Sequence, residues 1–197
     1  MKKLKIAILS YRSAPFGGGQ GIYVNDISRA LSIMGHKVDV ISGPPYPHLS
    51  DQVNLIKLPG LDLFQTFSFK ERLKIFLQKK NKKFIDFYEF SSTFFGGFPE
   101  MRTFGYRVNN FLKINNNYDV VIDNQSLSYG ILEIQKRFPF IEIIHHPISK
   151  DFKFELESAN SFLYKLSRYR WYSFLKMQKK VAKNINRIIT PSKNSLR

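Results

Sequence analysis

Two adjacent histidines, His145 and His146, are the residues of this sequence best suited to chemistry. Imidazole donates or accepts hydrogen bonds and exchanges a proton near neutral pH, so it suits acid–base work or contact with a substrate hydroxyl. One alternative is a histidine that only closes a strand end through a satisfied hydrogen bond. A metal site is disfavoured, because neighbouring residues of an extended strand point to opposite faces and no ligand cluster accompanies the pair.

A second polar group, Asp123-Asn124-Gln125, begins at the end of the strand predicted at 118–123. Asp123 could bind a ligand hydroxyl or orient a neighbouring histidine, whereas the simpler interpretation is that it caps the loop after a strand. Asn124 and Gln125 each carry a donor beside an acceptor, which suits a polyol. These three residues and His146 are therefore candidates for binding a hydroxyl-rich substrate.

A glycine-rich segment, Gly17-Gly18-Gly19-Gln20-Gly21, lies between a predicted strand and a predicted helix. Glycine lets the backbone adopt positive φ angles and approach a ligand closely. A loop that enters a helix N-terminus also presents free N–H groups and the positive end of the helix dipole, which suits a phosphate or another anion. The alternative is a turn whose glycines serve only its geometry.

This loop does not fit a nicotinamide or flavin dinucleotide site. That fingerprint places Gly-x-Gly-x-x-Gly directly after the first strand and an acidic residue at the end of the second. Here seven residues, 10–16, precede the first glycine, and the second strand runs into Ser42 and Gly43 without a carboxylate. A dinucleotide-dependent oxidoreductase is therefore the least favoured function.

Alternating apolar runs and helical patterns predict the elements that position these groups. Strands are expected at 6–9, 38–41, 53–58, 118–123, 141–144 and 187–190. Helices are expected at 22–34, 69–88 with a break near Asn81, 100–114, 127–137 and 158–184. Such alternation indicates an α/β, Rossmann-like parallel sheet with helices on both faces. Ligands of these sheets bind beyond the carboxyl ends of the strands, where all three polar groups would meet.

The chain is strongly basic, with 31 Lys and Arg against 15 Asp and Glu and a formal net charge of +16. An amphipathic helix that carries lysines beside aromatic residues can pack on its own domain or lie on an anionic membrane. A solvated lysine-rich surface is the alternative, and nucleic acid is disfavoured because no recognised binding motif appears. The candidate anion surface consists of Arg72, Lys74, Lys79, Lys80, Lys82 and Lys83.

The length of 197 residues fits a single domain. No cysteine is present, which excludes disulfides and thiolate chemistry and permits a cytoplasmic location. No apolar run approaches the ~18 residues of a membrane span. We expect a cytoplasmic protein, with peripheral attachment to the inner face of the membrane as an option.

Four segments, in this order, resemble family 4 glycosyltransferases of the GT-B fold: FGGGQGIYVNDISRALSIMGHKVDVIS, DVVIDNQSLSYG, IIHHPIS and RIITPSKNSL. The resemblance covers most of the chain and is weakest from 44 to 117. It implies that residues 1–197 form the N-terminal, acceptor-binding domain, the first half of a GT-B fold. A C-terminal donor-binding domain with a Glu pair and a basic residue for the diphosphate would lie outside this sequence, so this chain alone would have little or no activity.

The resemblance also implies roles for the candidate residues. His145 matches the histidine that lies beside the transferred sugar and would be catalytic. Gly18 and Gly19, with Gln20, would approach the diphosphate or the reacting acceptor. The remaining candidates, residues 123–125 and His146, would bind the acceptor.

The reaction that the resemblance implies is retaining transfer of a sugar from a nucleoside-diphosphate sugar to a hydroxyl of a lipid or a cell-surface glycan. It would require no metal and no other cofactor. The competing function is a non-catalytic, basic Rossmann-like module that binds an anionic membrane or a glycan.

Overall fold

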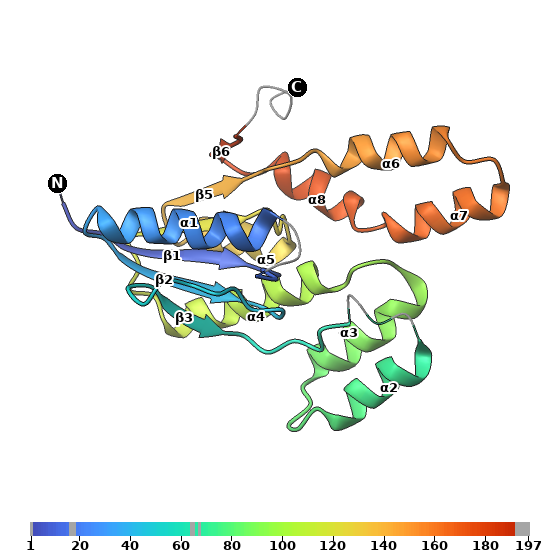
Figure 1. Ribbon diagram of the computed structural model, residues 1–197, viewed down its shortest axis with the longest axis horizontal. Helices are drawn as coiled ribbons and strands as arrows, with labels where there is room; N and C mark the ends of the chain where they lie inside the picture. The colour runs from blue at the N-terminus through green and yellow to red at the C-terminus, as the bar shows by residue number, and fades with distance from the viewer. Residues whose placement is uncertain (1, 16–18, 64–65, 67, 192–197) are drawn as a thin grey trace.

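The computed structural model describes residues 2–15, 19–63, 66 and 68–191. Its centre is a six-stranded sheet in the order β3-β2-β1-β4-β5-β6, in which every neighbouring pair is parallel (Figure 1). The α/β parallel sheet predicted from the sequence is therefore confirmed. The strands are β1 (Lys5–Ser10), β2 (Lys37–Ser42), β3 (Asn54–Lys57), β4 (Val120–Asn124), β5 (Phe140–Ile143) and β6 (Ile188–Ile189).

The strand order reverses between β1 and β4, which lie side by side at the centre of the sheet. The chain builds outward from β1 to β3 on one side and from β4 to β6 on the other. In open parallel sheets the crevice beyond the carboxyl ends at such a reversal is the usual ligand site. The glycine-rich segment follows β1, Asp123-Asn124-Gln125 covers the end of β4, and the histidines follow β5.

Two helices that follow β3 in the chain form a hairpin: α2 (Phe69–Gln78) and α3 (Phe84–Phe95). The break predicted near Asn81 is confirmed, because Asn81 has a φ of 52° in the turn between them. Arg107 anchors the hairpin to the body through the buried carboxylates of Asp86, at 2.8 Å, and Glu89.

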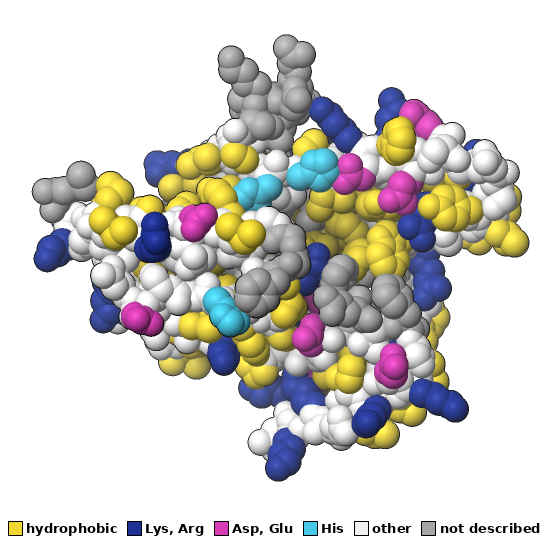
Figure 2. Space-filling model, in the orientation of Figure 1, with side chains coloured by type: hydrophobic (Ala, Val, Ile, Leu, Met, Phe, Trp, Pro, Cys, Tyr) yellow, Lys and Arg dark blue, Asp and Glu magenta, His cyan; other side chains and the backbone are white. Residues whose placement is uncertain are grey.

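The prediction of one long helix over 158–184 is wrong. Two helices, α7 (Phe162–Trp171) and α8 (Leu175–Ala182), occupy this segment, and α6 (Ile148–Glu157), which was not predicted, precedes them. The chain turns because the buried Tyr172 and Phe174 side chains pack inward at the break, and α8 buries one face while α7 buries no residue. Helices α6 and α7 project from the body as a second hairpin with exposed hydrophobic side chains (Figures 1 and 2).

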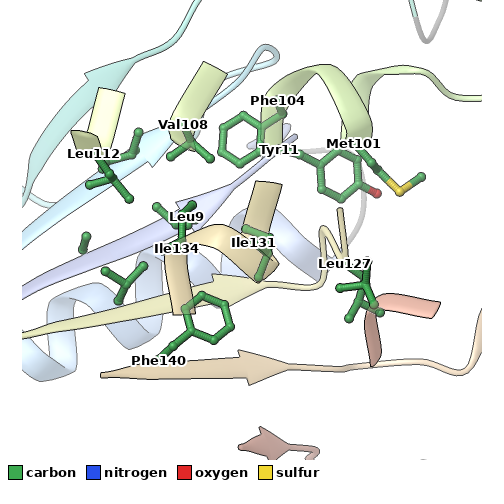
Figure 3. Close-up of a cluster of buried hydrophobic side chains, with 14 of the residues drawn as sticks. Leu9, Tyr11, Met101, Phe104, Val108, Leu112, Leu127, Ile131, Ile134 and Phe140 are labelled. Atoms are coloured by element: carbon green, nitrogen blue, oxygen red, sulfur yellow. The ribbon is translucent and has the colours of Figure 1, made fainter. Parts of the chain in front are cut away.

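Hydrophobic side chains fill both faces of the sheet. In β1 alternate residues point to opposite sides, so Ile8 joins a core beneath α1 (Gly19–Ile33) and Leu9 joins a larger core on the other face. The larger core, shown in Figure 3, lies against α4 (Glu100–Ile114) and α5 (Tyr129–Gln135). Each fully buried aliphatic side chain contributes roughly 1.5–3 kcal/mol, and this burial holds the carboxyl edge in place.

No helix among the described residues combines the length and hydropathy needed to cross a bilayer.

Candidate active site

His145 lies just beyond β5, and two other elements orient its ring. Its Nε2 atom is 2.5 Å from Oδ1 of Asn124 at the end of β4. Because an amide oxygen only accepts, Nε2 is the donor in this bond, and the neutral ring has the Nε2–H tautomer. The Tyr23 ring of α1 meets the imidazole edge-on, with 4.4 Å between the ring centroids.

Partial burial lowers the pKa of His145, because desolvation disfavours the imidazolium form. The imidazole is therefore neutral at pH 7. A neutral, oriented ring at a sheet edge can hydrogen-bond a hydroxyl without bringing a positive charge into the site.

Gln125 holds the turn that carries both histidines. Its Oε1 accepts from the backbone N–H of His145 at 2.8 Å and of His146 at 3.3 Å, and its Nε2 donates to the His146 carbonyl at 2.7 Å. The side chain is only 4% exposed, and its backbone has a φ of 57°. These bonds make Gln125 a support of the histidine turn, and its direct contact with an acceptor stays a prediction.

Asp123 is completely buried and caps the loop after β4. Its Oδ2 accepts from the backbone N–H of Ser126 at 2.8 Å and of Leu127 at 3.3 Å, and the Ser126 hydroxyl donates to the same carboxylate. These contacts favour the loop-cap interpretation over direct binding of a ligand. The predicted acceptor contact of Asp123 would require the loop to open.

Glu142 of β5 lies opposite Asp123 of β4 in the parallel register and is also completely buried. Neither carboxyl oxygen has a hydrogen-bond partner of ordinary geometry among the described residues, although the Asp123 carboxyl and the Gln125 backbone lie beside them. Burial, and then the negative charge of Asp123, raises the pKa of Glu142 well above its ordinary value. This shift of the pKa favours the protonated form of Glu142, which lies next to the loop cap beneath the histidine turn. Sequence reasoning missed this residue, whose signal was an acid within the apolar run of β5.

His146 turns toward α6, where its Nε2 lies 2.5 Å from Oδ2 of Asp151, and both side chains are exposed. The two histidines thus contact different partners, as expected of neighbours in an extended segment. Their different directions leave His146 at the rim of the site.

The glycine-rich segment contributes the start of α1 to this edge. Gly18 lies outside the described residues, and α1 begins at Gly19. Gln20 hydrogen-bonds the hydroxyl of the buried Tyr11, which follows β1. A Cβ at Gly21 would collide with the Ala14 carbonyl oxygen, whereas one at Gly19 would meet open space. The close backbone packing therefore explains Gly21, and a diphosphate contact at Gly19 and Gln20 stays a prediction.

The sequence model of Glycosyltransferase Family 4 matches residues 17–197. The chain belongs to glycosyltransferase family 4. A curated relative from Mycolicibacterium hassiacum, named MMP alpha-(1->4)-mannosyltransferase, is 42% identical over 195 residues. The match covers 98% of this chain and 46% of the relative, so the chain spans about half the length of the curated relative it matches.

Solved glycosyltransferase structures are more distant. The glycosyltransferase of kitacinnamycin and CalG4, the calicheamicin glycosyltransferase, both match at 12% identity with a TM-score of 0.48, over 96% of this chain and over 46% and 48% of theirs. UGT89C1 of Arabidopsis thaliana, complexed with UDP, matches at 12% identity with a TM-score of 0.47, over 99% of this chain and 46% of that one. Such TM-scores are too low to carry an argument, so the fold rests on the sheet topology of this chain.

For this family 4 chain, the structure brings His145, Asn124, Gln125 and Asp123 together at one sheet edge. Among these four residues and His146, the two histidines present side chains toward solvent, since the other three are 4% exposed or less. The site therefore consists of two outer histidines above the buried polar side chains of residues 123–125.

Half of the residues of the predicted anion surface bond to other parts of the protein, and the other half are exposed. Arg72 donates to the Thr66 carbonyl at 2.6 Å, Lys79 pairs with Asp86 at 2.6 Å, and Lys82 donates to the carbonyls of Leu77 and Lys79. These three side chains are half-buried and help to form the α2–α3 hairpin. The exposed members of the predicted surface are Lys74, Lys80 and Lys83.

Proposed function

We propose that this chain is the acceptor-side domain, the N-terminal half of a GT-B fold, of an enzyme that transfers a mannosyl group from a nucleoside-diphosphate sugar to an acceptor hydroxyl. The acceptor belongs to a lipid or a cell-surface glycan. The observation that carries this proposal is the 42% identity to an α-mannosyltransferase over 98% of the chain.

The proposed transfer retains the anomeric configuration. The bond between the anomeric carbon and the diphosphate oxygen breaks, the acceptor oxygen bonds to the same face of that carbon, and the acceptor proton leaves with the diphosphate. His145 hydrogen-bonds a hydroxyl of the transferred sugar, and Asn124 and Gln125 hold His145 in position. No metal or other cofactor takes part. The positive end of α1 lies at the same edge and favours the departing negative charge.

The donor is held by a second domain that is not part of this sequence. The support for this step is that the chain corresponds to 46% of the related mannosyltransferase. We therefore expect residues 1–197 alone to show little or no transfer.

A chimera tests the proposal. Residues 1–197 are joined to the remaining C-terminal part of the M. hassiacum relative and assayed with a panel of nucleoside-diphosphate sugars and α-mannoside acceptors. We expect mannosyl transfer by the chimera and none by the 197-residue chain. In the chimera, His145→Ala should lower kcat by about 10–100-fold, because it leaves a sugar hydroxyl without its hydrogen-bond partner, while the matched change His146→Ala, at the rim, should lower it less than tenfold. Transfer by the short chain alone, or a folded chimera that transfers no sugar to any of the acceptors, would contradict the proposal.

A second function, binding of an anionic membrane as a non-catalytic module, is favoured by the α2–α3 hairpin. Leu77 is 62% exposed and Phe84 is 85% exposed, beside the exposed lysines of the predicted anion surface. Apolar side chains beside lysines suit an interface with anionic lipid. In this function the protein is cytoplasmic and attaches to the inner face of the membrane.

Flotation with vesicles tests this second function. We expect the chain to bind vesicles that contain phosphatidylglycerol but not pure phosphatidylcholine. The triple change of Lys74, Lys80 and Lys83 to Glu should abolish binding. The control change Lys136→Glu, at the exposed residue that follows α5, should not. Binding that ignores both lipid charge and the triple change would overturn it.

A further inference from the structure

A hollow of about 320 Å³ opens between the two helical hairpins. Figure 2 shows hydrophobic side chains gathered between the α6–α7 and α2–α3 hairpins, with Lys and Arg side chains beside them. The volume lies at the lower end for small-molecule sites, so it suits one small ligand. Its lining includes a carboxyl, three guanidinium groups and an indole ring: Glu100, Arg72, Arg168, Arg170 and Trp171.

Contacts within the protein hold this lining in place. The Gly97 N–H donates to the Arg170 carbonyl at 3.1 Å, which ties the turn before α4 to the end of α7. Arg170 donates to the Thr93 carbonyl at 2.9 Å, which fixes its guanidinium. The Trp171 ring meets the Phe98 ring edge-on, with 4.5 Å between centroids. The hollow is thus formed before any ligand arrives.

Glu100, the first residue of α4, is the unusual member of the lining. Its Oε2 atom is enclosed and has no hydrogen-bond partner among the described residues. An enclosed polar atom without a partner costs about 1–3 kcal/mol, and such atoms in native proteins call for an explanation. Burial raises the pKa of Glu100 to about 7. Near pH 7 the protonated and ionised forms of Glu100 therefore coexist, and the protonated form can donate as well as accept a hydrogen bond.

The hollow lies on the same side of the sheet as the histidine turn, because both hairpins lie beyond the carboxyl ends of the strands (Figure 1). Tyr11, directly after β1, is buried and lies within electrostatic reach of both Glu100 and Asp123. Tyr11 also bonds Gln20 of α1. A ligand in the hollow would therefore lie beyond the carboxyl ends of the strands, as His145 does.

We propose that this hollow is the subsite for one hexose unit of the acceptor glycan, with Glu100 and Arg170 hydrogen-bonding its hydroxyls and the Trp171 ring packing against its apolar face. Carboxyl and guanidinium groups together offer acceptors and donors to neighbouring hydroxyls, and polar groups of this kind orient a ligand within a largely apolar pocket. This inference rests on the proposed function, because it names the part of the acceptor that the domain recognises.

The chain contains a single tryptophan, Trp171, so its fluorescence reports on this hollow. The 197-residue chain is titrated with methyl α-D-mannopyranoside, with an α-(1→4)-linked mannobiose and with inorganic phosphate. We expect a saturable change with the two sugars, stronger for the disaccharide. Glu100→Ala should raise the Kd at least tenfold and Arg170→Lys about threefold, while Lys136→Ala, on the exposed end of α5, should leave it unchanged.

The outcomes separate the alternatives. A response to phosphate but not to the sugars would overturn the inference and make the hollow an anion site, and a sugar response that survives Glu100→Ala would overturn it too. Circular dichroism of each variant checks folding, and Glu100→Gln replaces any variant that fails to fold. If the chimera transfers mannose but Glu100→Gln leaves its acceptor KM unchanged, the inference fails and the proposed function stands. If the chimera is inactive while Trp171 still responds to sugar, the proposed function fails and the subsite stands.

Discussion

The histidine turn and the α6–α7 hairpin follow each other in the chain, yet they are held in different ways. The turn rests on Asp123, Asn124 and Gln125, whose side chains are almost completely buried and satisfied by nearby groups. The hairpin buries no residue of either helix, and Phe154 on α6 is 72% exposed. The difference teaches that the sheet edge is built to keep one geometry, whereas the hairpin is built to present a surface.

The largest effect should come from the core beneath that edge. Phe104 of α4 is 2% exposed and packs in the larger core. Replacing it with alanine removes its buried area and leaves a cavity, so Phe104→Ala should lower the free energy of unfolding by about 3–5 kcal/mol. Urea unfolding measures this. A loss below 1 kcal/mol would show that the core at α4 is less tightly packed than its burial indicates.

Glu100, between the core and the hollow, should make stability depend on pH. Its pKa of about 7 in the folded chain lies above the ordinary value of 4.5. Folding therefore favours the protonated form, and its contribution is complete below about pH 4.5 and lost as the pH rises through 7. At 1.36 kcal/mol per unit, the shift corresponds to about 3 kcal/mol.

Unfolding of the wild type and of Glu100→Gln at pH 5 and pH 8 measures this effect. We expect the free energy of unfolding of the variant to rise relative to that of the wild type as the pH rises, because Gln cannot ionise. Parallel curves for the two proteins would contradict a protonated Glu100.

The histidine turn should respond to loss of its clamp. Gln125→Ala removes three hydrogen bonds to the backbone of His145 and His146, and at about 1 kcal/mol for each net bond the variant should lose about 3 kcal/mol of stability. In the chimera it should lower kcat more than it raises the KM for the donor, since it displaces His145. Gln125→Glu, which keeps the accepting oxygens, should recover part of the activity. An Ala variant with unchanged kcat would remove Gln125 from the positioning of His145.

The smallest effect should come from the hairpin. Phe154→Ala is matched in chemistry to Phe104→Ala, but most of the Phe154 ring already contacts solvent. It should change the free energy of unfolding by less than about 0.5 kcal/mol. A loss of 2 kcal/mol or more in the same urea experiment would mean that α6 is packed, and the contrast between the two regions would disappear.

Local pattern was enough to predict much of the fold. Apolar runs predicted all six strands, and helical spacing predicted α4 with its observed ends. Gly35, with a φ of 87°, closes α1. These features depend on residues near in sequence, because strand burial and helix capping are decided within a few positions. The sequence also predicted that the three polar groups meet at one edge, because the carboxyl ends of parallel strands lie at the same edge of a sheet.

Tertiary contacts decided what those groups do. Whether Asp123 caps a loop or meets a ligand depended on where Ser126 and Leu127 lie after the chain turns. The pairing of Glu142 with Asp123, the break at Tyr172, and the hollow between Glu100 and Trp171 each join segments far apart in the chain. Spacing along a sequence carries no information on such meetings, because burial, pKa and hydrogen-bond partners arise only when distant segments pack together.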